Sequence, residues 1–344
     1  MRSLSTRMVE DPYHSAHFHA SHGKSPQDGR PVEGLRMSQA GAYAHRPVMR
    51  DEVLSLLEPV PPGVYVDATL GGGGHAAAVL SAHRDLSLVG IDREQDALDA
   101  AALVLDAFGD RVTLVHDRFD RLGDHVTGVA VSAVLFDLGV SSPQLDRPDR
   151  GFSYRGDGPL DMRMDRTQAL TAADVVNGYD EAELARLFVQ NGETRFGRRI
   201  ARRIVAARPL STTVELAEVV RDAIPAATRR TGGHPARRTF QAIRIEVNGE
   251  LRILADAVDA GIDVLVPGGR LVVISYHSGE DRIVKERITD AVTGGCVCPP
   301  GMPCVCGAVP RVRLVHRGAR KPSAVEIQDN PRAESARLRV VEKL

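Results

Sequence analysis

The sequence predicts an α/β fold in which a doubly wound, parallel sheet is interrupted by a helical insertion. Through residue 136, short apolar runs rich in β-branched residues alternate with helix-forming segments. No convincing strand follows between about residues 150 and 249, and the alternation resumes after that gap. We therefore expect 43–149 and 250–344 to form one discontinuous nucleotide-binding domain, and 150–249 to form an insertion that holds the substrate.

The composition is that of an ordinary globular protein. Of the 344 residues, 43% are hydrophobic and 26% are charged, and the formal net charge of −1 gives no general attraction to nucleic acid. Residues 1–42 lack apolar periodicity and predict a disordered tail. Because no apolar run is long enough to span a membrane and no signal-like pattern opens the chain, we expect a cytoplasmic protein without membrane contact.

The first part of the sheet is predicted from four strands. A short amphipathic helix precedes them, and Pro61-Pro62-Gly63 separates that helix from the first strand. The fourth strand is almost entirely apolar, which indicates burial on both faces. The predicted helices cover residues 51–57 and 93–108. The first predicted strand begins at Val64, and the next three cover residues 86–91, 111–116 and 129–136.

The insertion and the end of the chain follow from helical periodicity and one further apolar strand. The segment 194–208 places Phe196, Ile200 and Ile204 on one helical face. Other helices are predicted after a cap at Thr171, over 179–189 and over about 250–264. A turn at 267–269 leads into a strand over 270–277, the segment 309–316 follows the cysteine-bearing loop, and 338–341 is predicted as a final edge strand.

Four consecutive glycines, Gly71–Gly74, lie between the first strand and a helix that begins near His75. Such a turn lets a ligand approach the bare backbone and the free N–H groups of the helix. The second strand ends at Asp92, where an acidic side chain commonly binds ribose hydroxyls. The spacing is neither a dinucleotide fingerprint nor a phosphate loop. S-adenosylmethionine fits these features best, and a glycine-rich turn without a ligand is the alternative.

Asp137 follows the buried fourth strand at the same edge of the sheet. A polar group there can accept an N–H of an exocyclic amine and orient its lone pair toward a methyl donor. The alternative is an acid that caps a loop through Ser141 and Ser142. Nearby, Phe119 is a candidate for packing against adenine or for the core, and Gln144 is a candidate hydrogen-bond partner of the cofactor.

A candidate nucleic-acid surface lies within the insertion. Arginines gather on the helical face opposite the apolar positions of 194–208, with no acidic residue between them. The alternative is a solvated, charged helix face, and an aromatic content of 4% argues against a broad base-stacking surface. The candidates are Arg195, Arg198, Arg199, Arg202 and Arg203, with Arg229, Arg230, Arg237 and Arg238 in a following loop.

All four cysteines fall within eleven residues, as Cys296-x-Cys298 and Cys304-x-Cys306. Four thiols can bind zinc tetrahedrally, but pairs with one intervening residue are not the usual spacing and make ligation by so short a loop strained. The sequence leaves a structural zinc site and a metal-free loop open, and we assign no catalytic metal.

Long loop motifs spread over the chain resemble those of the MraW family, also called ribosomal RNA small subunit methyltransferase H. The resemblance covers about residues 43–344. The matching segments are His45–Met49, Gly71–His75, Gly90–Arg93, Asp137–Asp146, Arg150–Tyr154, Asp157–Asp165, Gly192–Arg195, Thr239–Arg244 and Ser275–Ser278.

The resemblance implies a class I S-adenosylmethionine-dependent methyltransferase fold with a helical insertion. It also implies methyl transfer to N4 of a cytidine in the decoding region of 16S ribosomal RNA, with the RNA or the 30S subunit as partner. It does not settle a catalytic base, so the role of Asp137 rests on its position. The implied cofactor-binding residues are Gly73, Gly74, His75, Asp92, Phe119, Asp137 and Gln144.

Two other interpretations of the sequence are a methyltransferase for DNA or a free amine, and a ribosome-assembly or nucleic-acid-binding factor without turnover. The intact glycine turn and Asp137 argue against the second. The sequence predicts no particular oligomeric state.

Overall fold

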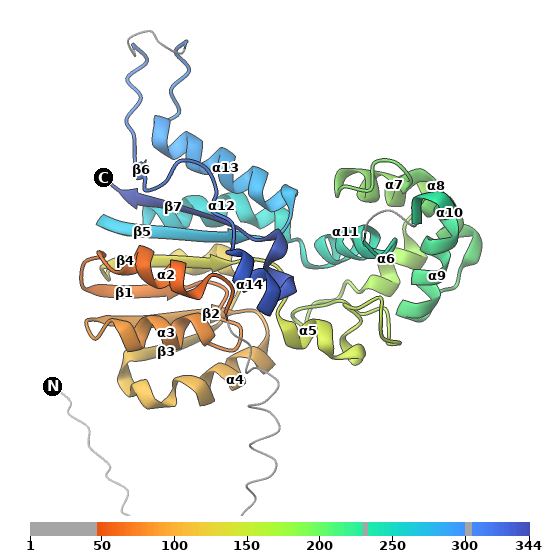
Figure 1. Cartoon of the computed structure of the whole chain (residues 1–344), viewed down its shortest axis with the longest axis horizontal. Coiled ribbons are helices and arrows are strands. Elements are labelled where there is room, and N and C mark those ends of the chain that lie inside the picture. Colours follow the sequence, from red (N-terminus) through yellow and green to blue (C-terminus); the bar gives the residue numbers. More distant parts are fainter. Residues whose placement is uncertain (1–46, 230–232, 300–304) are drawn as a thin grey trace, which may run out of the picture.

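The computed structural model describes residues 47–229, 233–299 and 305–344. The predicted tail over 1–42 lies outside these residues. The core is a seven-stranded sheet in the order β3-β2-β1-β4-β5-β7-β6, in which β1 to β5 pair in parallel and β7 is antiparallel to both neighbours (Figure 1). The strands are β1 Gly63–Asp67, β2 Leu86–Asp92, β3 Val112–His116, β4 Val131–Asp137, β5 Leu265–Ser275, β6 Val312–Leu314 and β7 Arg337–Lys343.

Two strand predictions near the C-terminus are wrong. The last strand, β7, is not at the edge of the sheet, because the three-residue β6 pairs with its outer side. In addition, β5 begins at Leu265 and runs through the glycines that were predicted as a turn. Its register with β4 jumps from Val131↔Leu265 to Ala133↔Arg270, so the extra residues bulge out without ending the strand.

Helices cover both faces of the sheet (Figure 1). On one face α2 (Arg50–Leu57), α3 (Gly74–Ala82) and α4 (Gln95–Leu105) bury apolar side chains against Leu88, Leu135 and Ile274. On the other face α12 (Glu250–Asp263) and α13 (Ser278–Thr293) pack over Val134, Phe136 and Val273. Helix α13 was not predicted, because it buries few apolar residues among many charged ones.

The insertion leaves the sheet after β4 and forms a separate cluster of helices beside it (Figure 1). Its hydrophobic core includes Phe188, Ile200, Ile204 and Ile243, all fully buried. The apolar face predicted for 194–208 is therefore confirmed. A short helix, α5 (Ser142–Asp146), precedes the insertion, whose own helices are α6 Ala172–Gly178, α7 Glu181–Gln190, α8 Gly197–Ala207, α9 Thr213–Ala223, α10 Ala226–Arg229 and α11 Arg237–Asn248.

One further correction concerns Arg237 and Arg238, which were predicted in a loop. Both lie in the first turn of α11 and are exposed. Pro235, two residues before the helix, suits a helix start, and Thr239, Phe240 and Ile243 bury the opposite face. The helix was missed because the Gly/Pro-rich segment before it dominated the local pattern.

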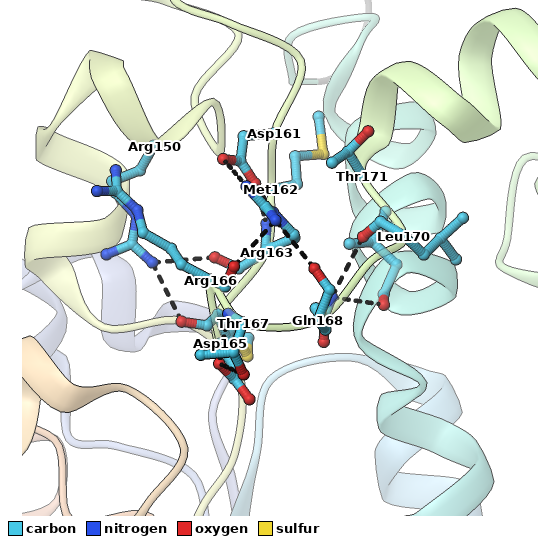
Figure 2. Close-up of polar contacts among 12 residues, drawn as sticks. Arg150, Asp161, Met162, Arg163, Asp165, Arg166, Thr167, Gln168, Leu170 and Thr171 are labelled. Atoms are coloured by element: carbon cyan, nitrogen blue, oxygen red, sulfur yellow. Dashed lines mark hydrogen bonds and ion pairs between the residues drawn. The ribbon is translucent and has the colours of Figure 1, made fainter.

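Buried polar contacts join the insertion to the sheet. Arg150 forms an ion pair with Glu94, at the start of α4, and donates hydrogen bonds to the carbonyls of Arg163 and Met164. Figure 2 shows Arg150 reaching into the loop over residues 161–168, where the Arg163 guanidinium is held by Asp161. The insertion loop is thus tied to the end of β2, close to the glycine turn.

Candidate cofactor and substrate site

A cavity of about 1230 Å³ lies at the carboxyl ends of the parallel strands, between the sheet and the insertion. Pockets for a single small ligand typically measure roughly 300–1,000 Å³, so this cavity has room for two ligands. Gly74, Asp92 and Asp137 line it from the sheet, and Tyr154 and Phe240 line it from the insertion.

The glycine turn forms one wall of the cavity. Gly71, Gly72 and Gly74 line it, and Gly71 has a positive φ of 52° with open space where a side chain would be. Gly73 does not line the cavity. It precedes α3 with φ 78°, and a Cβ there would lie 3.3 Å from Ala101, so its role is to let the turn pack against α4.

Asp92 connects the end of β2 to this turn. Its Oδ2 accepts a hydrogen bond from the Gly71 amide and its Oδ1 accepts one from the Glu94 amide, each at 2.8 Å. Burial raises the pKa of Asp92 to about 6. Asp92 lines the cavity, and each of its carboxylate oxygens has a second lone pair that can accept a hydrogen bond from a hydroxyl group.

Asp137 lies at the centre of the cavity wall. Its Oδ1 accepts a 2.7 Å hydrogen bond from the Tyr276 hydroxyl, and its Oδ2 lies 3.6 Å from Nε2 of His75. Burial raises the pKa of Tyr276 well above its usual value, so the hydroxyl remains a donor. Tyr276 and His75 therefore flank the carboxylate.

His75 is 6% exposed and lines the cavity. Within the described part of the chain, neither of its ring nitrogens has a hydrogen-bond partner. A buried imidazole without a hydrogen-bond partner costs free energy, and a polar ligand in the cavity would relieve that cost.

Phe119 and Gln144 also line the cavity, but both contact protein groups as well. Phe119 packs edge-on against Phe136, with ring centroids 5.8 Å apart, so it belongs to the core and to the cavity wall. Gln144 is buried, accepts from the Ser141 amide and donates to Glu94. Its amide therefore holds the loop after β4 in place.

Aromatic side chains from the insertion form the opposite wall. The rings of Tyr154 and His234 stack with centroids 4.3 Å apart, and Tyr154 meets Phe240 edge-on. Burial, together with the charges of Arg155 and Arg221, lowers the pKa of His234, so its ring is neutral at pH 7. This pair could not be predicted from the sequence, because Tyr154 and His234 lie far apart along the chain and only the fold brings them together.

The arginine face of α8 is exposed but lies away from the cavity. Arg195, Arg198, Arg199, Arg202 and Arg203 are all exposed, and none lines the cavity. Arg202 pairs with Glu181 at 3.4 Å, and Arg195 lies over the Phe196 ring. Among the predicted arginines whose side chains the structure describes, Arg237 lines the cavity. Figure 1 shows its helix, α11, on the side of the insertion nearest the sheet.

Comparison with known proteins decides the family. A model described as the MraW methylase family matches residues 42–344. The chain belongs to the MraW methylase family. Curated proteins named ribosomal RNA small subunit methyltransferase H are similar along almost their whole length. The protein from Frankia alni is 53% identical over 87% of this chain and 95% of its own, and that from Thermobifida fusca is 50% identical over 93% and 98%.

Among solved structures, an rRNA methylase from Streptococcus thermophilus is similar over 88% of this chain and 98% of its own, with 14% identity and a TM-score of 0.40. The family confirms the predicted fold class, a class I methyltransferase, and the predicted methyl donor, S-adenosylmethionine. Within the described residues, no helix is long and apolar enough to cross a membrane.

The residues that line the cavity can bind S-adenosylmethionine. The turn offers bare backbone at Gly71, Asp92 has lone pairs to spare for hydroxyls, and Phe119 offers an apolar edge. The unpartnered imidazole of His75 faces the same space.

Proposed function

We propose that this MraW-family chain transfers a methyl group from S-adenosylmethionine to N4 of a cytidine in the decoding region of 16S ribosomal RNA. One observation carries the proposal: a carboxylate held between Tyr276 and His75 faces a cavity with a glycine turn on one side and stacked aromatic rings on the other. The names of the relatives support small-subunit ribosomal RNA as substrate.

For the cofactor, we propose that Asp92 binds the ribose hydroxyls, Phe119 packs against the adenine, and backbone amides near Gly74 and His75 approach the amino-acid part. Gly73 and Gln144 support this site by holding the turn and the loop after β4 in shape. Bound there, S-adenosylmethionine supplies an electrophilic methyl group on a sulfonium.

For the chemistry, we propose that Asp137 accepts an N–H of the cytidine amine and so orients the nitrogen lone pair. Tyr276 donates to Oδ1, so Oδ2 is the oxygen proposed to accept this N–H. The methylated amine then loses one proton to solvent. Because methyl transfer is an in-line displacement, orientation contributes more than acid–base strength.

For the RNA, we propose that the insertion, residues 150–249, is the substrate domain. The neutral stack of Tyr154 and His234 offers a flat surface for a base displaced from its helix. Phosphate contacts are proposed for Arg237 at the cavity, for Arg238 beside it, and for the arginine face of α8 farther away.

The test is mass-spectrometric mapping of methylated cytidine in 16S ribosomal RNA from cells that lack the protein. We expect one N4-methylcytidine to disappear from the decoding region and to return with the wild-type gene. It should not return with Asp137→Ala, whereas the exposed Asp99→Ala serves as the matched control and should restore it.

A purified-enzyme assay separates the alternatives. Labelled methyl groups should enter 30S subunits or their RNA, and not duplex DNA or free amines. Incorporation into DNA alone would make this chain a DNA methyltransferase, and cofactor binding without turnover on any substrate would make it an assembly factor. Because the proposed substrate is ribosomal RNA, we also propose that the protein is located in the cytoplasm.

A further inference from the structure

An extended arm projects from the sheet domain between α13 and β6 (Figure 1). Its described residues, 294–299 and 305–311, form neither helix nor strand. Val297 and Val305 are 86% and 88% exposed, so the described arm has no apolar core of its own. A short segment without a core or a strand ladder needs another cross-link to hold one shape.

Three cysteines bring the two sides of this arm together. The sulfur atoms of Cys296, Cys298 and Cys306 all lie within 4.8 Å of one another. The Cys306 thiol donates a hydrogen bond to Sγ of Cys296, with the two sulfur atoms 3.6 Å apart. Sulfur atoms on a tetrahedral zinc ion with bonds of about 2.3 Å are separated by roughly 3.8 Å, so the sulfur atoms of Cys296 and Cys306 are about as close as a shared ion requires.

The backbone favours thiolates at this place. The Val305 amide donates a hydrogen bond to Sγ of Cys298, across the arm from it. Amide donors to sulfur stabilise negative charge on the ligand and are typical of the outer contacts of metal sites. At the foot of the arm, the Arg311 amide donates to the Ala291 carbonyl, which fixes where the two sides leave the domain.

We propose that Cys296, Cys298 and Cys306 bind one zinc ion as thiolates, and that this ion is the cross-link that shapes the arm. Binding releases the thiol protons to solvent and involves no redox step. A fourth tetrahedral position remains for a further ligand. The site is structural, because none of the arm residues that the structure describes lines the cavity.

The test is metal analysis of the full-length protein purified under reducing conditions without added metal. We expect about one zinc per chain, and cobalt(II) substitution should give thiolate-to-metal charge-transfer absorption. Cys306→Ser should weaken zinc affinity, measured against a chromogenic chelator, by at least about 100-fold. Val297→Ser places a hydroxyl between two of the ligands without removing one and should retain full zinc content.

Cofactor affinity should be unchanged in Cys306→Ser, which shows that the sheet domain is still folded. The zinc content of the wild type decides the matter even if that variant does not fold. Substoichiometric zinc in the reduced wild type, or a Cys296–Cys306 disulfide in protein alkylated at lysis, would overturn the proposal.

Discussion

The Tyr276 hydroxyl donates a 2.7 Å hydrogen bond to Oδ1 of Asp137, from the loop after β5 to the end of β4. The two strands are neighbours, and Asp137 is in register with Ile274, two residues before Tyr276. The contact therefore follows from the parallel pairing itself. It fixes one carboxylate oxygen, and the other lies 3.6 Å from Nε2 of His75.

We expect Tyr276→Phe to lower kcat by about tenfold to a hundredfold, because a hydrogen bond to a charged group contributes roughly 1.5–3 kcal/mol. Cofactor affinity should change little, since the ring remains. Tyr179→Phe is the matched control, because Tyr179 also donates to a carboxylate, Glu246, but does not line the cavity. If both variants have the same kcat, the Tyr276 hydroxyl does not position Asp137 for catalysis.

Asp92→Asn should weaken the binding of S-adenosylmethionine by at least about tenfold in a calorimetric titration. The amide keeps the shape and one oxygen acceptor, but it loses the charge that strengthens hydrogen bonds to hydroxyls. Asp96→Asn, an exposed acid in the first turn of α4, is the control and should bind like wild type. Unchanged affinity in Asp92→Asn would show that the ribose is bound elsewhere.

Some residues of the candidate site could be predicted from the sequence, and others could not. Asp92 and Asp137 could be predicted because each ends an apolar strand, and the carboxyl ends of parallel strands meet at one edge. Tyr154 and His234 could not, since their contact depends on how the insertion packs. The same holds for β7, whose place in the sheet depends on a three-residue partner, β6, with an exposed Leu314.

Asp67 predicts an unusual pH dependence of stability. Burial raises the pKa of Asp67 to about 6, well above the value of 3.8 for an aspartate side chain exposed to water. Between these values the folded chain holds a proton that the unfolded chain has lost, so the contribution to the free energy of unfolding is present at low pH and is lost as pH rises through about 6. When the pH is lowered from about 8 to about 5, protonation of Asp67 should add about 1.4 kcal/mol to the free energy of unfolding.

Urea denaturation of wild type and Asp67→Asn at both pH values measures this contribution. We expect the wild type to gain more stability on acidification than the variant does. The exposed Asp99→Asn should behave like wild type. Parallel pH profiles for wild type and Asp67→Asn would mean that Asp67 is ionised in the folded protein throughout this range.

The buried ion pair of Arg150 and Glu94 should be essential to the attachment of the insertion. Arg150→Met leaves Glu94 buried without its partner, which we expect to cost about 3–5 kcal/mol in urea denaturation. Adding Glu94→Gln should recover part of this loss. Arg147→Met breaks an exposed pair with Asp96 and should cost less than about 1 kcal/mol. Equal losses in Arg150→Met and Arg147→Met would contradict the prediction.

The arginine face of α8 gives the last prediction. Changing Arg198, Arg199 and Arg203 together to Glu should weaken RNA binding. It should also reduce the slope of log affinity against log salt by about 2–3, because each lost phosphate contact removes roughly 0.7–0.9. Affinity for S-adenosylmethionine should be retained, since none of these side chains lines the cavity.

The control is the same change at three exposed arginines of the sheet domain, Arg84, Arg282 and Arg317. It alters the net charge equally, so it accounts for general repulsion of RNA. A larger loss of salt dependence in the α8 variant places phosphates along that helix, and the RNA then extends from the cavity across the insertion. If both variants bind RNA alike, the arginine face is a solvated surface and the contacts are confined to α11, where Arg237 lines the cavity.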